Sequence, residues 1–157
     1  MIVFSNTTPI IALSSIKRLD LLPRLFGKIH LVNEVVEECE VGGPISVPNL
    51  RKLDWIEIVP STPITYPSIL LELDKGEKHT LDMAVKYNAD WVVIDEKIGR
   101  NLTEYLGLRV TGTLGILLKA KQQAWLPSFR DSVRAMQDKG IRYHAGLVDK
   151  LAVGVGE

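Results

Sequence analysis

The 157-residue sequence holds a single cysteine, Cys39, and no apolar run that approaches the length of a membrane span, which needs ~18–20 residues. One cysteine excludes an internal disulfide framework and suits a reducing cytosol. The N-terminus lacks the charged-then-apolar pattern of a secretory signal. We therefore expect a cytoplasmic protein with no membrane partner, and a hydrophobic content of 46 % fits a single domain over residues 1–157.

Motifs for zinc and for nucleotide phosphates are also missing. The three histidines, His30, His79 and His144, are scattered and do not have the spacing of zinc ligands. No glycine-rich loop of the P-loop or dinucleotide-binding type is present. Cys39 follows Val35 and Val36 on one helical stripe and is expected to pack as a small hydrophobic residue. These absences disfavour zinc enzymes, P-loop NTPases and dinucleotide-dependent oxidoreductases.

The chain has no net charge at pH 7, so total charge does not indicate a nucleic-acid partner. The distribution is uneven: residues 1–96 hold 9 basic and 14 acidic residues, and residues 97–157 hold 10 and 5. An acidic half joined to a basic half is typical of a metal pocket beside a phosphate-binding surface. Two solvated faces that differ by chance explain the same numbers, and composition does not choose between them.

Short apolar runs alternate with amphipathic segments along the chain. The runs predict strands at residues 2–4, 28–32, 55–59, 91–94 and 108–110. The amphipathic segments predict helices at residues 10–16, 34–40, 75–87, 97–106, 113–123 and 128–139. Thr8 and Pro9 are the expected N-cap and first residue of the first helix, and Asn33 is the expected cap of the second. Proline- and glycine-rich stretches at 41–48 and 60–67 predict loops. The alternation indicates an α/β fold with a mostly parallel sheet.

Acidic residues recur where such a sheet places its functional crevice, at the carboxyl ends of the strands. Asp95 directly follows the apolar run "WVVI", and Glu96 follows Asp95. A purely structural alternative is that Asp95 caps the next helix while Glu96 favours the positive helix N-terminus. Glu77 shares a helix face with Leu81 and Ala84, so it is expected to point toward the sheet. A helix-dipole glutamate is again the alternative.

The helix in "NEVVEECE" offers a third acid. Glu38 and Glu40 both flank its buried stripe, and periodicity does not choose between them. Converging carboxylates repel one another unless a cation lies between them, and Mg²⁺ or Mn²⁺ is the natural occupant of an all-oxygen site. Such an ion activates water and stabilises the charge on a phosphate that is being cleaved. The residues thus predict a metal-dependent phosphodiester-cleaving site.

With these residues assembled, the sequence resembles the PIN-domain family, and within it the VapC-like toxin nucleases. The motifs "SNTTPIIAL", "VNEVVEEC", "KGEKHTLDMA", "VVIDEKIGR" and "GLRVTGTLGILLKAK" carry the resemblance, in the family's order, over residues 3–121. The resemblance implies a three-layer α/β/α sandwich with a mostly parallel central sheet. It also implies a Mg²⁺- or Mn²⁺-dependent endoribonuclease that cleaves single-stranded RNA, acts as the toxin of a toxin–antitoxin pair, forms a homodimer and binds a small antitoxin protein.

The same resemblance selects the site residues. It favours Glu38 over Glu40, because the family's helix acid follows a V-x-x-E pattern. It matches Glu77 and Asp95 to the next two acid positions and lets Glu96 share the last role. At the end of the first strand, the family pattern has Asp where this chain has Asn6. Asn still offers a carbonyl oxygen to a metal, but it removes one charge, which lowers the affinity of a hard-cation site.

Two functions therefore remain open: the nuclease, and a catalytically weak PIN-like protein that binds RNA or a partner. A receiver-like signalling domain is less favoured, since no acid pair follows the first strand. Arg100 lies one helical turn beyond Glu96 and is expected to reach a bound phosphate. The other predicted RNA-binding residues are Thr8, Lys119 and Lys121. Thr8 sits in the first turn, where it is equally well explained as an N-cap, and the two lysines lie late in their helix.

Overall fold

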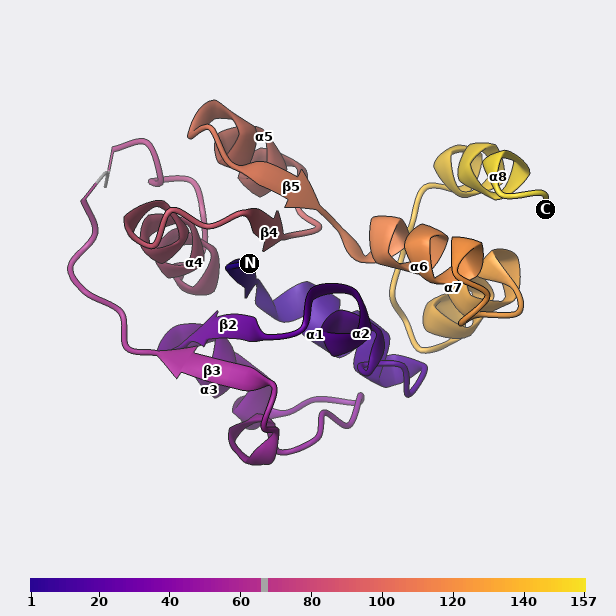
Figure 1. The fold of residues 1–157 in the computed structure, drawn as a ribbon, viewed down its shortest axis with the longest axis horizontal. Helices are drawn as coiled ribbons and strands as arrows, with labels where there is room; N and C mark the ends of the chain where they lie inside the picture. Colours follow the sequence, from indigo (N-terminus) through magenta and orange to yellow (C-terminus); the bar gives the residue numbers. More distant parts are fainter. Residues whose placement is uncertain (66–67) are drawn as a thin grey trace.

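A five-stranded sheet, entirely parallel, forms the centre of the protein. The computed structural model describes residues 1–65 and 68–157, so Tyr66 and Pro67 of the predicted 60–67 loop lie outside the described residues. The strand order is β3-β2-β1-β4-β5 (Figure 1). The strands are β1 Val3–Ser5, β2 Ile29–Val32, β3 Ile56–Val59, β4 Trp91–Val93 and β5 Arg109–Thr111. All five predicted strands are confirmed to within a residue or two.

Helices follow the strands and pack on the sheet, which makes the fold a three-layer α/β/α sandwich. The α-helices are α1 Thr7–Ser15, α2 Leu21–Phe26, α3 Asn33–Val41, α4 Lys75–Lys86, α5 Lys97–Tyr105, α6 Thr113–Gln122, α7 Phe129–Asp138 and α8 Ala145–Gly154, and a short 3₁₀ helix spans Leu50–Lys52. Figure 1 shows α6, α7 and α8 grouped beyond β5, on the opposite side of the molecule from α4. No helix in the described part of the chain combines the length and apolarity of a membrane span.

Strand β1 lies between β2 and β4 and is fully buried. Phe4 aligns with His30 on one side and with Val92 on the other. Parallel strands that are covered on both faces need apolar side chains at every position, not at alternate ones. This explains why "IVF" and "WVVI" are unbroken apolar runs and why both strands could be predicted.

The first helix begins earlier than expected. Asn6 is its N-cap and Thr7 its first residue, so the prediction that Thr8 and Pro9 open the helix was wrong by two residues. Pro9 is tolerated because the first N–H groups of a helix have no partner within the helix. Likewise Asn33 is the first residue of α3, and the N-cap is Val32.

Helices α2 and α8 were not predicted. Helix α2 has six residues with Pro23 among them, and α8 contains Gly146 and Gly154, so neither has the composition of a helix interior. The end of α8 is tied to α7: the Glu157 carboxylate accepts hydrogen bonds from the backbone N–H groups of Phe129, at 2.6 Å, and Arg130, at 3.0 Å. These bonds fix α8 relative to the rest of the C-terminal helices.

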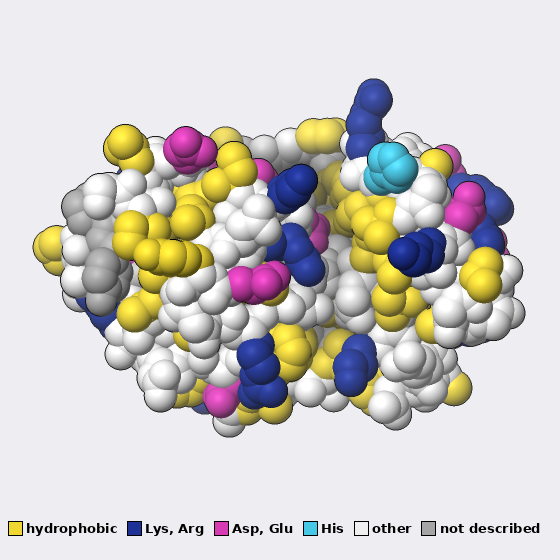
Figure 2. Space-filling view, turned by 90° about the horizontal axis from the view of Figure 1, so that it is seen from above, with side chains coloured by type: hydrophobic (Ala, Val, Ile, Leu, Met, Phe, Trp, Pro, Cys, Tyr) yellow, Lys and Arg dark blue, Asp and Glu magenta, His cyan; other side chains and the backbone are white. Residues whose placement is uncertain are grey.

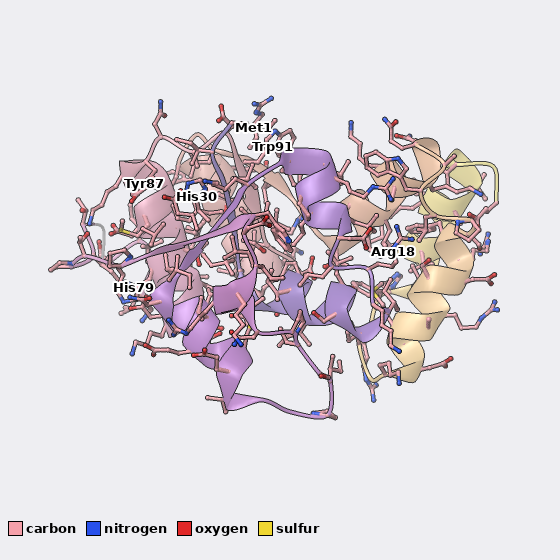
Figure 3. All side chains as sticks on the ribbon, turned by 60° about the horizontal axis from the view of Figure 1, so that its bottom comes forward. Met1, Arg18, His30, His79, Tyr87 and Trp91 are labelled. Carbon is pink, nitrogen blue, oxygen red and sulfur yellow. The ribbon has the colours of Figure 1, made fainter. Side chains whose placement is uncertain are left out.

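The histidines take part in packing and capping. His30 stacks at 5.2 Å from the ring centroid of Phe4 and lies near Tyr87, as Figure 3 shows, with its Nε2 3.0 Å from a Glu57 carboxylate oxygen. His79 Nε2 lies 3.8 Å from Glu34. His144 caps α8 by accepting a hydrogen bond from the backbone of Leu147.

Candidate active site

The predicted metal ligands belong to elements that meet at the carboxyl edge of the sheet. Asn6 follows β1 directly and is only 4 % exposed. Its side chain makes no capping hydrogen bond, and its Oδ1 is buried without a hydrogen-bond partner in the described structure. A buried carbonyl oxygen without a partner costs about 1–3 kcal/mol. This oxygen is therefore available to a ligand that accepts electron density, such as a cation.

Glu38 extends from α3 toward this edge. Its Oε2 accepts a 2.5 Å hydrogen bond from the Thr7 hydroxyl, beside Asn6. Its carboxylate also lies against Gly76 at the start of α4, where a Cβ at position 76 would come within 2.5 Å of Glu38 Oε1. Glu40 points elsewhere and forms an exposed ion pair with Arg51 at 2.7 Å. The structure thus separates the two acids that periodicity left open, and Glu38 is the one at the carboxyl edge.

Glu77 is the most deeply buried acid of the set, at 5 % exposure. It forms a capping box with Asp74, in which each side chain accepts a hydrogen bond from the other residue's backbone N–H. Burial, together with the neighbouring carboxyls of Asp74 and Glu96, raises the pKa of Glu77 to about 7. Its Oε2 is buried without a partner among the described residues, and a Cβ at Gly99 would lie 3.3 Å from it.

Asp95 is hydrogen-bonded to the first residue of α6. Its Oδ1 accepts from the backbone N–H of Thr113 and its Oδ2 from the Thr113 hydroxyl, each at 2.7 Å. Burial raises the pKa of Asp95, while the bonds from Thr113 and the charge of Arg100 oppose that rise. Arg100 donates to the Ile94 carbonyl at 3.1 Å, which holds its guanidinium beside Asp95.

Glu96 is the N-cap of α5. Its carboxylate accepts hydrogen bonds from the backbone N–H groups of Ile98, at 3.0 Å, and Gly99, at 2.8 Å. The capping role considered above for Asp95 therefore belongs to Glu96, and Asp95 is held by another helix. Whether Glu96 also contributes to catalysis stays a prediction.

A series of contacts connects the four predicted metal ligands around the edge. Thr7, the neighbour of Asn6, donates a hydrogen bond to Glu38. The Glu38 carboxylate lies against Gly76, the neighbour of Glu77. The Glu77 carboxylate lies near Gly99, whose backbone N–H is bonded by Glu96, the neighbour of Asp95. In residues 1–65 and 68–157, however, no three Asp, Glu, His or Cys side chains are grouped closely enough to hold an ion together. That all four ligands surround one ion stays a prediction.

The donor chemistry of this edge fits a hard cation. Two buried oxygens, Asn6 Oδ1 and Glu77 Oε2, lack partners in the described chain, and the remaining donors, on Glu38 and Asp95, are carboxylate oxygens. Hard divalent cations such as Mg²⁺ and Mn²⁺ take such ligands. The carboxylates of Glu38 and Asp95 now accept hydrogen bonds from threonines, so they would hold an ion through their remaining lone pairs or by exchanging those partners.

The predicted RNA-binding residues divide into two groups. Arg100 lies at the site and Thr8 is exposed in the first turn of α1. Lys119 lines a cavity with Met1 and Trp91, which Figure 3 shows together at the amino edge of the sheet. Lys121 donates to the Pro127 carbonyl at 2.8 Å and lies 3.4 Å from Glu157. A parallel α/β fold puts the end of α6 opposite the acidic edge, so an RNA role for the two lysines stays a prediction that the geometry does not favour.

Sequence reasoning missed two groups around Asp95. Thr113 binds both Asp95 oxygens, and its signal was the "TGT" that joins a strand to a helix at a carboxyl edge. Tyr143 lies close enough for burial and the charge of Asp95 to raise the pKa of its phenol. Nothing in the pattern around Tyr143 signalled this, since the recognised motifs end at residue 121.

The protein is thus a parallel α/β/α sandwich with acidic side chains along the carboxyl edge of its sheet. A family model described as a PIN domain matches residues 2–157. The chain therefore belongs to the PIN-domain family, whose members are generally metal-dependent nucleases. No curated protein and no solved structure matches the chain.

The raised pKa of Glu77 predicts a pH-dependent stability in the metal-free protein. Because the folded protein holds the Glu77 proton up to about pH 7 and an unfolded chain releases it near pH ~4.3, the folded state binds more protons between these values. The free energy of unfolding should then fall as pH rises through that window. In Glu77→Gln the decline should be shallower. Urea denaturation in chelator at pH 4.5, 5.5, 6.5 and 7.5 measures it, and parallel curves for both proteins would contradict the assignment.

Proposed function

We propose that this PIN-domain protein is a Mg²⁺- or Mn²⁺-dependent endoribonuclease that cleaves single-stranded RNA. One observation carries the proposal: Asn6, Glu38, Glu77 and Asp95 are linked by contacts along one sheet edge, where two buried oxygens have no partner in the described chain. The family's general dependence on divalent metals supports the same interpretation.

The roles of the residues follow from their positions. Glu38, Glu77, Asp95 and the Asn6 carbonyl would hold the ion, which when bound supplies an activated water and neutralises phosphate charge. Thr113 keeps the Asp95 carboxylate oriented. Arg100, fixed by the Ile94 carbonyl, offers its remaining N–H groups to a phosphate near Asp95. An oriented acid and an adjacent guanidinium can position a phosphodiester and stabilise the charge that develops as it is cleaved.

We further propose that the nuclease is the cytoplasmic toxin of a toxin–antitoxin pair, binds a small antitoxin protein and forms a homodimer. The support for these points is the ordered likeness of the motifs over residues 3–121 to VapC-like toxin nucleases. Expression of the chain in a bacterial host tests the toxin role: growth should stop with the parent and continue with Asp95→Asn.

A catalytically weak RNA- or partner-binding protein is the second candidate. Two observations favour it: the first-strand position holds Asn6, which lacks a charge, and no three acidic, histidine or cysteine side chains in the described residues are already grouped around an ion position. This candidate expects RNA binding with no cleavage at any metal concentration.

A cleavage assay with end-labelled single-stranded RNA decides between the two. The purified protein is incubated with Mn²⁺, with Mg²⁺, with Ca²⁺ or with EDTA, and the RNA is resolved on a denaturing gel. We expect internal cleavage with Mn²⁺ or Mg²⁺ and none with EDTA, and much less cleavage when the same RNA is paired in a duplex. Binding without cleavage across all metals would establish the second candidate instead.

The contact between Glu38 and Gly76 allows the role of Glu38 in metal binding to be tested by a substitution at position 76. In Gly76→Ala, the new methyl would meet Glu38 Oε1 at 2.5 Å and displace that carboxylate, the flexible end of a side chain. Alanine is favoured over glycine in a helix by about 1 kcal/mol, so the melting temperature in EDTA should hold or rise. The gain in melting temperature on adding Mn²⁺ should shrink.

Gly154→Ala is the matched control, because Gly154 is also helical and a Cβ there meets nothing within 4 Å. Thermal denaturation of the three proteins with EDTA and with Mn²⁺ measures both effects. If Gly76→Ala gains as much from Mn²⁺ as the parent does, Glu38 is not a metal ligand.

A further inference from the structure

A cleft opens beside Asp95, between α5 and β5 on one side and the C-terminal helices on the other. Its volume is about 510 Å³, within the range of roughly 300–1,000 Å³ that small-ligand sites occupy. Asp95, Thr111 and Gly112 lie at its floor. Figure 2 looks onto this face and shows the hollow, with basic side chains on the α5 side and a hydrophobic patch on the side of the C-terminal helices.

The α5 wall carries two cations and one acid. Lys97, Arg100, Asn101 and Glu104 line it, and Arg100 is the residue that lies beside Asp95. Within the part of the chain that the structure describes, neither Lys97 nor Arg100 forms a salt bridge to a carboxylate. These cations are free to meet an anion that enters the cleft.

The opposite wall is apolar. It is built from α6 and α8 by Leu114, Leu118, Leu147 and Leu151, with Tyr143 beneath them. Leu147 is 46 % exposed, which leaves apolar surface facing water in a concave site. The Tyr143 hydroxyl is buried beside Thr113 and close to the lining of the cleft, where it can serve an entering polar group.

We propose that this cleft binds the RNA nucleotide next to the scissile phosphate, with its base against Leu147, Leu151 and Tyr143 and its phosphate toward Arg100. The inference rests on the proposed nuclease function and assigns α8 as part of the substrate site. A nucleotide combines a phosphate anion with a base whose flat face is largely apolar. The cleft offers two cations, Lys97 and Arg100, on one wall and an apolar surface on the other, and both adjoin the candidate catalytic acid Asp95.

A protein segment is less well matched to this arrangement. An apolar peptide side chain would use the leucine wall but would leave Lys97 and Arg100 unpaired around Asp95. In an RNA strand every base is joined through its ribose to a phosphate, and stacking or apolar contact with a base tolerates any sequence.

Paired ligands separate base contacts from phosphate contacts. Fluorescein-labelled oligouridylate and an abasic RNA oligomer with the same number of phosphates are titrated with the parent, Leu147→Ala and Val153→Ala, with Ca²⁺ as the ion. Binding is followed by fluorescence anisotropy, and a gel verifies that the RNA stays intact. Val153 is the control because it is 68 % exposed on the same helix and does not line the cleft.

We expect Leu147→Ala to bind oligouridylate about tenfold more weakly than the parent, since truncating one leucine removes apolar contact worth about that much. The same variant should bind the abasic oligomer as the parent does, and Val153→Ala should match the parent on both. Tyr143→Phe should lower affinity for oligouridylate by a smaller factor, because only its hydroxyl is removed. Melting curves verify that each variant is folded.

The outcomes separate this subsite from the nuclease proposal. Cleavage by the parent with unchanged oligouridylate affinity in Leu147→Ala would overturn the subsite alone. Leu147-dependent binding of oligouridylate by a parent that never cleaves would overturn the nuclease function and leave a base-binding cleft. A parent that binds both oligomers equally, or neither, would overturn the subsite and point to a protein segment as the occupant.

Discussion

Asp95→Asn is expected to reduce metal-dependent RNA cleavage by on the order of a hundredfold, because it removes the negative charge of a side chain that would hold the ion, whose bound form would supply an activated water. The substitution should leave the fold intact. The carbonyl of the introduced asparagine can still accept from the Thr113 backbone N–H, as Asp95 does at 2.7 Å. The Thr113 hydroxyl now donates to Asp95, and it can turn to accept from the new amide instead.

Single-turnover cleavage and thermal denaturation, run on the same preparations, separate chemistry from stability. Asp138→Asn is the matched control, since Asp138 is exposed at the end of α7, away from the sheet edge. If Asp95→Asn cleaves as fast as the parent, Asp95 only anchors the start of α6 and the catalytic assignment is wrong. If it loses activity together with its cooperative melting transition, Asp95→Glu provides a variant that keeps the charge.

Asn6→Asp should lower the stability of the protein without metal and raise it when metal is bound. The Asn6 Oδ1 is buried without a partner in the described chain, and a carboxylate there adds a desolvated charge on the edge that holds Glu38 and Glu77. In EDTA the variant should be less stable by roughly 1–3 kcal/mol. With Mn²⁺ the added charge should bind the ion more tightly, so both stability and the rate of cleavage should exceed those of the parent.

Melting curves at increasing Mn²⁺ concentration, together with cleavage rates, measure this reversal. Asn49→Asp is the control: Asn49 is also an N-cap residue, where it accepts from the backbone of Arg51, but it is exposed to solvent and not buried as Asn6 is. Equal Mn²⁺ responses in the parent and Asn6→Asp would show that position 6 does not contact the ion. A stability gain without added cleavage would support the binding protein over the nuclease.

The parts of the fold that could be predicted are those whose structural signal lies in a few consecutive residues of the sequence. β1 and β4 lie inside the sheet, and the runs "IVF" and "WVVI" that contain most of their residues are apolar throughout. Helix α4 begins with a capping box formed by Asp74 and Glu77, a pattern visible in the sequence. No such signal marks α2 or α8. Pro23 interrupts the helical pattern of the first and two glycines weaken that of the second, so tertiary packing, not local propensity, forms them.

The positions of the acids in the candidate site could also be predicted from the sequence, but their hydrogen-bond partners could not. Acids that follow strands or begin helices could be located, because parallel strands fix where such positions lie. Their partners could not, since the bond from Thr7 to Glu38 spans 31 residues and the bonds from Thr113 to Asp95 span 18. The choice between Glu38 and Glu40 illustrates the difference. Helix periodicity leaves both possible and the family pattern favours Glu38, but the ion pair that holds Glu40 on Arg51 is visible only in the structure.

The central position of β1 has a consequence for how the protein is made. Val3 pairs with Trp91, and the Ile2 backbone N–H donates to the Asp90 carboxylate at 2.7 Å, so the middle of the sheet joins segments 88 residues apart in the chain. Contacts of such sequence separation slow folding. At translation rates of about 5–20 residues per second, β1 waits on the order of ten seconds for β4 to emerge. During that interval an apolar strand has one open side, and the acidic edge cannot form until Thr113 has followed Asp95 out of the ribosome.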